Sequence, residues 1–327
     1  MNVLVTGGAG YVGSHAARCL ERAGHEIWIY DNLSEGNRGA VRQQRLIVGD
    51  LMDRPKLVSV LRDHRVESVM HFAASAYVGV SVERPADYYQ NNVVGTLSLM
   101  EAMRETGVNR MVFSSTCATY GIPEIVPITE NEKQQPINPY GFTKLVIERA
   151  LSDYAAAYGW SYAALRYFNA SGAAAEGDLG EDHDPETHLI PIVLQTALGQ
   201  REAVLVFGDD YPTPDGTCIR DYIHVEDLAA AHISALNRLG PGVQFQLNLG
   251  TGAGFTVRQV IDACERVSGR KIPCRIAPRR AGDPPALVAN AERARRELGW
   301  HPKYTTIESI VETAWRWHQS HPQGYAD

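Results

Sequence analysis

Tyr140 and Lys144 stand four residues apart in the segment Tyr-Gly-Phe-Thr-Lys, at the start of a stretch whose apolar pattern predicts a helix. The i, i+4 spacing places the phenol and the ammonium on one face of that helix. Because a nearby cation favours a phenolate, we expect Lys144 to lower the pKa of Tyr140, which would make it a general acid or base near neutral pH. The spacing is also common by chance, and an amphipathic helix could carry it for solubility alone.

Three glycines, Gly7, Gly10 and Gly13, connect an apolar strand at the N-terminus to a helical pattern. In such a G-x-x-G-x-x-G connection the glycines allow a sharp turn, close approach of a phosphate and close packing of the helix on the sheet. The start of the helix offers free N–H groups to an anion. A second strand ends at Asp31, whose carboxylate suits the ribose hydroxyls of NAD and repels the extra phosphate of NADP. This segment therefore predicts a dinucleotide site that takes NAD.

Strands and helices alternate through the first half of the chain. The pattern predicts further strands at 45–48, 68–72, 110–114 and 161–166, and helices at 55–65, 87–105 and 140–158. Repeated strand–helix units predict an α/β fold with a doubly wound parallel sheet of the Rossmann type, whose ligands bind at the carboxyl ends of the strands. The polar residues expected to line that crevice are Asp31, Asp50, His71, Ser114, Ser115, Thr116 and Asn169. This context favours the catalytic interpretation of Tyr140 and Lys144.

The alternation stops near residue 170. Residues 172–188 are small and acidic without a periodic pattern, and helices at 189–198, 225–239, 257–267, 291–298 and 307–318 and strands at 203–207 and 244–249 follow. We expect an NAD-binding Rossmann domain at 1–169 and a smaller mixed α/β domain at 170–327 that binds the substrate, with some segments returning to the first domain. The acids and histidines of 180–188 lack an ordered spacing, so we expect no metal site.

The composition argues against several classes of function. Hydrophobic residues make up 44% of the 327-residue chain and charged residues 21%, which is ordinary for a globular protein. A net charge of −7 argues against nucleic acid or an anionic membrane as a partner. No apolar run approaches the ~18 residues of a membrane span, no signal peptide is expected, and the five cysteines contain no C-x-x-C pair. We expect a cytoplasmic protein.

More specific motifs lie in the second half of the chain. The sequence reads Phe-Gly-Asp-Asp-Tyr-Pro-Thr at 207–213, Arg-Asp-Tyr-Ile-His-Val at 220–225, Ala-Pro-Arg-Arg at 277–280 and His-Pro-Gln-Gly-Tyr at 321–325. With these motifs the chain resembles, over essentially its whole length, the extended short-chain dehydrogenases/reductases and, within them, the UDP-glucose (UDP-galactose) 4-epimerase family. The resemblance implies that UDP-glucose and UDP-galactose are interconverted through a 4-keto intermediate with bound NAD.

The family pattern implies a role for each matching residue. Tyr140 takes the proton of the sugar 4-hydroxyl while NAD⁺ takes the hydride, Lys144 holds the nicotinamide ribose, and Thr116 hydrogen-bonds the same hydroxyl. The residues implied to contact the cofactor are Gly7, Gly10, Tyr11, Val12, Gly13, Asp31, Asn32, Asp50, Leu51, Phe72, Ala73, Ala74, Asn91, Thr116, Tyr140, Lys144 and Phe168. Those implied to contact the UDP-sugar are Thr116, Tyr140, Asn169, His188, Leu189, Phe207, Arg220, Arg280, Asp283 and Leu287, with the two arginines at the diphosphate.

A homodimer is also implied, with the helices at 87–105 and 140–158 as its interface. These helices carry more apolar residues than one buried face requires. The residues in question are Leu97, Leu99, Met100, Ile147 and Leu151.

Three positions depart from the family pattern. Ala76 stands where some epimerases have a lysine that reaches the cofactor, and His188 replaces a common asparagine. Leu287 stands where some relatives have a tyrosine that limits the pocket, so we expect the extra space to admit an N-acetyl group at the sugar 2-position.

Other functions stay open from the sequence. The chain could epimerise UDP-N-acetylglucosamine or a UDP-pentose instead. A nucleotide-sugar dehydratase shares the fold but usually carries an Asp-Glu pair after the threonine, where this chain has Cys117 and Ala118. A net oxidoreductase is disfavoured because the second-half motifs match epimerases. A regulatory protein that senses the cofactor would have no use for Thr116, Tyr140 and Lys144 together.

Overall fold

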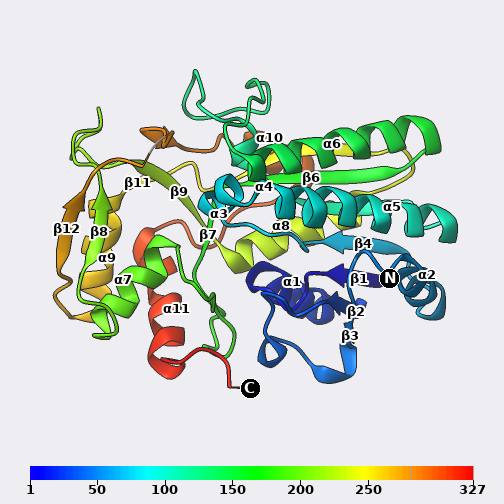
Figure 1. Ribbon diagram of the computed structural model, residues 1–327, viewed down its shortest axis with the longest axis horizontal. Helices are drawn as coiled ribbons and strands as arrows, with labels where there is room; N and C mark the ends of the chain where they lie inside the picture. The colour runs from blue at the N-terminus through cyan, green and yellow to red at the C-terminus, as the bar shows by residue number, and fades with distance from the viewer. Residues whose placement is uncertain (281, 327) are drawn as a thin grey trace.

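The computed structural model describes residues 1–280 and 282–326. Within these ranges a seven-stranded parallel sheet has the order β10-β6-β5-β4-β1-β2-β3 (Figure 1). The strands are β1 (Asn2–Thr6), β2 (Glu26–Asp31), β3 (Leu46–Val48), β4 (Ser68–His71), β5 (Arg110–Thr116), β6 (Ser161–Tyr167) and β10 (Gln244–Leu249). The predicted doubly wound Rossmann-type sheet is confirmed.

Helices cover both faces of this sheet (Figure 1). On one face α1 (Tyr11–Arg22) and α8 (Val225–Arg238) pack together, and α10 (Glu292–Leu298) joins the same core. On the other face lie α2 (Arg54–Asp63), α5 (Gly95–Thr106) and α6 (Pro139–Tyr158). Because successive side chains of a strand point to opposite faces, Val3 and Val5 join the first core and Leu4 the second. In the described part of the chain, no helix is long and apolar enough to cross a membrane.

The helix predicted at 87–105 is three consecutive helical segments. α4 (Pro85–Tyr88) leads into a π-helical segment, Tyr89–Val94, which continues as α5. The wider π turn contains Asn92, whose amide accepts a hydrogen bond from Ser75 N (2.9 Å) and donates one to Thr143 Oγ1 (3.1 Å). A short helix that was not predicted, α3 (Val78–Glu83), precedes this region.

The second half of the chain forms a smaller α/β unit (left in Figure 1). Its helices α7 (Leu189–Ala197), α9 (Val257–Ser268) and α11 (Ile307–Ser320) share a third core, and all three follow the predicted ranges closely. β9 (Ile219–His224) pairs with β7 (Asn169–Ser171), β11 (Gly254–Thr256) and β13 (Ala286–Leu287), and β8 (Val204–Phe207) pairs with β12 (Cys274–Ala277).

The segments beyond residue 169 do not all stay in this smaller unit. β10 pairs with β6 at one edge of the large sheet, and α8 packs on α1. The division into domains at residue 169 stays a prediction.

Candidate active site

A cleft of about 1340 Å³ is lined by residues that follow the large sheet's strands and by residues of the smaller unit. It brings together most of the predicted site. The predicted residues that line it are Gly7, Gly10, Tyr11, Val12, Gly13, Asp31, Asn32, Leu51, Phe72, Ala73, Ala74, Asn91, Thr116, Tyr140, Phe168, Asn169, His188, Leu189, Phe207, Arg220, Arg280, Asp283 and Leu287. Two predicted contact residues, Asp50 and Lys144, lie outside this lining.

Three of the strand-end polar residues expected in the crevice lie elsewhere. Ser115 points to the opposite face of β5 from Ser114 and Thr116, since side chains alternate along a strand, and it donates to Glu148 Oε1 at 2.5 Å. His71 is buried, with Thr6 and Thr96 hydroxyls at its two ring nitrogens. Asp50 accepts a hydrogen bond from Asn32 Nδ2 at 2.9 Å and so supports a residue that lines the cleft.

The glycine turn has a shape that only glycine allows at two of its positions. Gly7 has a φ of +70°, and a Cβ there would lie 2.3 Å from Ala73 N. A Cβ on Gly13 would lie 2.1 Å from Gly7 O. Within the described ranges no side chain caps the start of α1, which follows Gly10, so its first N–H groups face the cleft side of the turn. A turn of this shape can hold a phosphate, and we call it the cradle.

Asp31 is fixed next to this cradle. Its Oδ2 accepts a hydrogen bond from Ala9 N at 2.9 Å, and its Oδ1 accepts one from Leu33 N at 2.8 Å. The carboxylate lines the cleft at the end of β2, where a ribose is bound in Rossmann-type folds.

Tyr140 lies in the first turn of α6. Asn138 caps this helix by accepting a hydrogen bond from Gly141 N (2.8 Å), and Pro139 begins it. Tyr140 and Thr116 both line the cleft and are nearly buried, at 8% and 6% exposure. Lys144 is 3% exposed, and its Nζ donates to Ser114 O at 2.8 Å and lies 5.8 Å from the centre of the Tyr140 ring.

The expected lowering of the Tyr140 pKa by Lys144 is wrong for this structure. Burial raises the pKa of the Tyr140 phenol, Tyr167 adds to the increase, and a hydrogen bond with Thr116 opposes it. Burial also lowers the pKa of Lys144 to about 7, with Glu148 opposing. Burial is therefore the largest influence on both groups, and the Lys144 ammonium donates its hydrogen bond to a backbone carbonyl.

The two arginines predicted at the diphosphate both line the cleft. Arg220 lies on β9 and forms an ion pair with Asp283. The guanidinium of Arg280 lies 4.1 Å from the centre of the Phe207 ring. Arg279, in contrast, pairs with Asp210 at 2.7 Å outside this lining. Leu287, on β13, is the register partner of Arg220, which places it beside the same wall.

Four side chains of the acidic segment converge in the wall of the cleft, and the sequence analysis missed them as a group. Glu181, His183, Glu186 and His188 each place a nitrogen or oxygen within 4.8 Å of the others. Burial opposes protonation of the two histidines, but the carboxylates raise the pKa of His183 to about 9 and that of His188 to about 10. The signal in the sequence is the spacing Glu-x-His-x-x-Glu-x-His, which the sequence analysis did not recognise as ordered.

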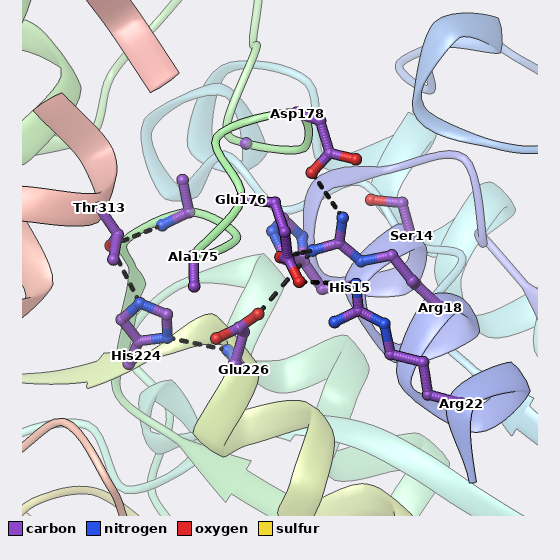
Figure 2. Close-up of polar contacts among 12 residues, drawn as sticks. Ser14, His15, Arg18, Arg22, Ala175, Glu176, Asp178, His224, Glu226 and Thr313 are labelled. Atoms are coloured by element: carbon purple, nitrogen blue, oxygen red, sulfur yellow. Dashed lines mark hydrogen bonds and ion pairs between the residues drawn. The ribbon is translucent and has the colours of Figure 1, made fainter. Parts of the chain in front are cut away.

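The acidic segment is fastened to α1 by two arginines (Figure 2). Arg18 forms ion pairs with Asp178 at 2.7 Å, Glu176 at 3.6 Å and Glu226 at 3.8 Å. Arg22 pairs with Glu176 at 2.8 Å. The ion pairs therefore hold residues 176–178 against α1, just before the segment that carries the four converging side chains.

The amino-acid sequence matches a known protein family. Residues 3–250 match the model of the NAD dependent epimerase/dehydratase family. The chain belongs to this family. The cradle of Gly7 and Gly13 and the carboxylate of Asp31 fit the phosphates and ribose of the cofactor in the family's name.

Individual members are similar over their full length. The chain is 52% identical to the UDP-glucose 4-epimerase of Halalkalibacterium halodurans over 327 residues, which cover 100% of this chain and 98% of that protein. The structure of UDP-glucose 4-epimerase from Brucella ovis in complex with NAD is 53% identical, covers 96% of this chain and 97% of that one, and has a TM-score of 0.93. The structure of UDP-glucose 4-epimerase from Bifidobacterium longum in complex with NAD⁺ and UDP is 38% identical in sequence. It covers 99% of this chain and 100% of that one, with a TM-score of 0.95.

Proposed function

We propose that this protein is an NAD-dependent 4-epimerase that interconverts UDP-glucose and UDP-galactose. The observation that carries the proposal is that one cleft contains Tyr140 and Thr116 together with the phosphate cradle and with Arg220 and Arg280. A proton-transfer group, a cofactor site and a diphosphate site thus share one space. Full-length similarity to UDP-glucose 4-epimerases supports the same reaction.

The chain's own residues supply binding and proton transfer. The cradle holds the cofactor pyrophosphate and Asp31 its ribose hydroxyls. When bound, NAD⁺ supplies a hydride acceptor for the sugar C4 and the positive charge of its nicotinamide ring. Burial raises the pKa of the Tyr140 phenol, and the positive charge of a bound nicotinamide ring would oppose that increase. Tyr140 then accepts the proton of the 4-hydroxyl and later returns it, while Thr116 hydrogen-bonds the same oxygen. Lys144 holds the nicotinamide ribose and orients Tyr140 through α6.

The cleft is large enough for a dinucleotide and a UDP-sugar to share it. Its volume of about 1340 Å³ exceeds the range of roughly 300–1,000 Å³ that ordinary ligand pockets occupy. Arg220 and Arg280 hold the diphosphate through guanidinium hydrogen bonds, and Phe207, Asn169 and Leu189 complete the nucleotide site. Because the nucleotide is held at its diphosphate, the hexose can present either face for reduction of the 4-keto intermediate.

The dehydratase alternative lacks an acid where it needs one. Cys117 and Ala118 follow Thr116, and both line the cleft. Burial raises the pKa of the Cys117 thiol to about 12, so this side chain does not exchange protons near neutral pH. Elimination of water from the sugar therefore has no acid at this position.

The test is an assay of the purified, untagged protein with UDP-galactose and no added cofactor. We expect UDP-glucose to form up to the equilibrium ratio, observed by NMR, without net NADH at 340 nm. Stoichiometric NADH with no inverted product would make the protein a net oxidoreductase, and loss of water a dehydratase. Parallel assays with UDP-N-acetylglucosamine and UDP-pentoses rank the sugars.

Replacing Gly13 by alanine is expected to weaken NAD binding. The new Cβ would overlap Gly7 O at 2.1 Å, so the cradle must shift, and overpacking of this kind costs about 1–3 kcal/mol. The matched control is Gly240→Ala, where the nearest atom to the new Cβ is 3.8 Å away. Calorimetry with NAD on the cofactor-free proteins measures the effect, and equal affinity of both variants would contradict it.

Replacing Leu287 by tyrosine is expected to weaken activity on UDP-N-acetylglucosamine while largely sparing that on UDP-galactose. Leu287 lines the cleft, and a tyrosine ring there would fill the space that an N-acetyl group needs. The measurement is the ratio of kcat/KM for the two substrates in both proteins. If the wild type has no activity on the N-acetylated sugar, the argument from pocket size is wrong.

We propose that the protein is a homodimer. The sequence analysis assigned the apolar residues of two helices to the dimer interface, and this assignment is partly wrong. Four of these residues are buried in the core of the chain itself: Leu99, Met100, Ile147 and Leu151. The π-helical segment, α5 and the start of α6 expose the apolar side chains of Tyr89, Val94, Leu97 and Phe142, and the rings of Tyr89 and Phe142 are 6.4 Å apart. Tyr158, at the far end of α6, is also exposed. A second copy would cover this patch.

Sedimentation at micromolar concentration tests the dimer. We expect twice the 36.0 kDa chain mass for the wild type and the single mass for Phe142→Glu. A monomeric wild type would contradict the proposal.

A further inference from the structure

Glu181, His183, Glu186 and His188 form a compact group that takes no part in the proposed proton transfer, although the family resemblance implies that His188 contacts the UDP-sugar. All four line the cleft beside the start of α7. Nδ1 of His188 lies 2.9 Å from Glu181 Oε1 and 2.9 Å from Glu186 Oε1. Nδ1 of His183 lies 3.2 Å from Glu181 Oε1 and 3.6 Å from Glu186 Oε2. Two ring nitrogens and carboxylate oxygens thus converge on one point.

Hydrogen bonds within the group leave it incompletely satisfied. A ring nitrogen carries at most one proton, and that of His188 Nδ1 is directed to Glu186 Oε1. Among the described residues, Glu181 Oε1 and His183 Nδ1 form no hydrogen bond of regular geometry and have only the ion-pair contacts within the group. Glu181 is only 4% exposed, so water is a poor substitute for the missing partner. A buried carboxylate oxygen and a ring nitrogen, 3.2 Å apart, are therefore both without a regular hydrogen bond.

The spacing of the donor atoms fits a small tetrahedral ion. Bonds of about 2.0–2.1 Å from Zn²⁺ to imidazole nitrogen or carboxylate oxygen put neighbouring ligand atoms about 3.3–3.4 Å apart. The four separations between a histidine nitrogen and a carboxylate oxygen, 2.9–3.6 Å, bracket this value, and one ligand atom from each of the four residues lies within 4.8 Å of the others. Two carboxylates also balance the charge of a divalent cation when both imidazoles are neutral.

The ligands are held in place by contacts outside the group. Glu186 Oε1 accepts hydrogen bonds from Thr187 N and His188 N, each at 2.7 Å. Trp317 Nε1 donates to Glu181 O at 3.1 Å. The His183 ring meets Tyr11 edge-on, at 6.1 Å between ring centres. Such support orients ligands before a metal ion arrives.

We propose that Glu181, His183, Glu186 and His188 bind one divalent metal ion of the zinc class. The ion has a structural role, because four protein ligands fill a tetrahedral site and leave no position for substrate. It connects the acidic segment, which Arg18 holds against α1, to His188 at the start of α7. Leu189, the next residue, lines the cleft, so the ion fixes part of the substrate wall.

The test is calorimetric titration of Zn²⁺ into the full-length, untagged protein after treatment with a chelator. Cys274 is exposed and is replaced by serine in every sample, which removes a competing thiolate. We expect one Zn²⁺ per chain, and a visible spectrum typical of tetrahedral coordination when Co²⁺ is titrated instead. His183→Ala should weaken Zn²⁺ binding by about 100-fold or more.

Two further variants keep the test decisive. Glu181→Gln preserves the side-chain shape but removes a ligand charge, and it should weaken binding like His183→Ala even if that variant folds poorly. His301→Ala, which removes an exposed histidine outside the group, should bind as the wild type does. Absence of saturable Zn²⁺ binding, or wild-type affinity in both ligand variants, would overturn the proposal and leave the group as ion-paired histidines and glutamates.

Discussion

Replacing Tyr140 by phenylalanine is expected to lower kcat by roughly 10²–10⁴-fold, the usual contribution of a positioned acid–base group. Tyr140 lies at the cleft surface beside Thr116, so its phenol is the group that can exchange a proton with the 4-hydroxyl. The affinity for UDP should hardly change, because Arg220 and Arg280, not the phenol, are proposed to hold the diphosphate. Steady-state kinetics and UDP titration measure the two effects separately.

The same helix offers a control for this variant. Tyr158 is at the end of α6 and is 53% exposed, so Tyr158→Phe should leave kcat unchanged. Turnover near the wild-type rate in Tyr140→Phe would reject Tyr140 as the acid–base group. A joint loss of UDP binding would show instead that the phenol supports the structure of the cleft.

Replacing Arg166 by methionine is expected to lower the free energy of unfolding by about 3–5 kcal/mol, the usual cost of breaking a buried ion pair. Arg166 and Glu148 are each 3% exposed and pair at 2.6 Å. Glu148 also accepts a hydrogen bond from the hydroxyl of Ser115, which precedes Thr116 on β5. Without the guanidinium, Glu148 keeps a buried charge but loses its ion-pair partner.

Urea denaturation of wild type and variant measures this effect. Arg149→Met is the matched control. Arg149 lies next to Glu148 on α6 and forms an exposed i, i+4 ion pair with Asp153, which contributes about 0.3–0.5 kcal/mol. The double variant Arg166→Met/Glu148→Leu should recover part of the loss, since it removes both charges. If Arg166→Met costs no more than Arg149→Met, the buried pair does not stabilise the fold.

Several features followed from the sequence because they depend on local geometry. The glycine turn could be predicted because it is defined by a strand, the helix that follows it and positions where a side chain would collide with the backbone, as at Gly7 and Gly13. The large sheet followed from the sequence because short apolar runs predict its buried strands and a helical period predicts the helices between them. The strands β7, β9, β11, β12 and β13 were missed. Four of them have only two to four residues and β9 carries several polar residues, and their pairing is set by distant segments.

Amino-acid order alone determined the chemistry available to this protein: the phosphate cradle, the acid at the end of β2, and a tyrosine and lysine on one helix. Tertiary structure decided how that chemistry behaves. Burial raises the pKa of Tyr140 and lowers that of Lys144, and burial depends on what packs around α6. Folding also brings Glu181 and Glu186 against two histidines, because Arg18 and Trp317 hold the acidic segment from opposite ends of the chain. Such convergence depends on contacts between residues far apart in sequence, which local spacing does not encode.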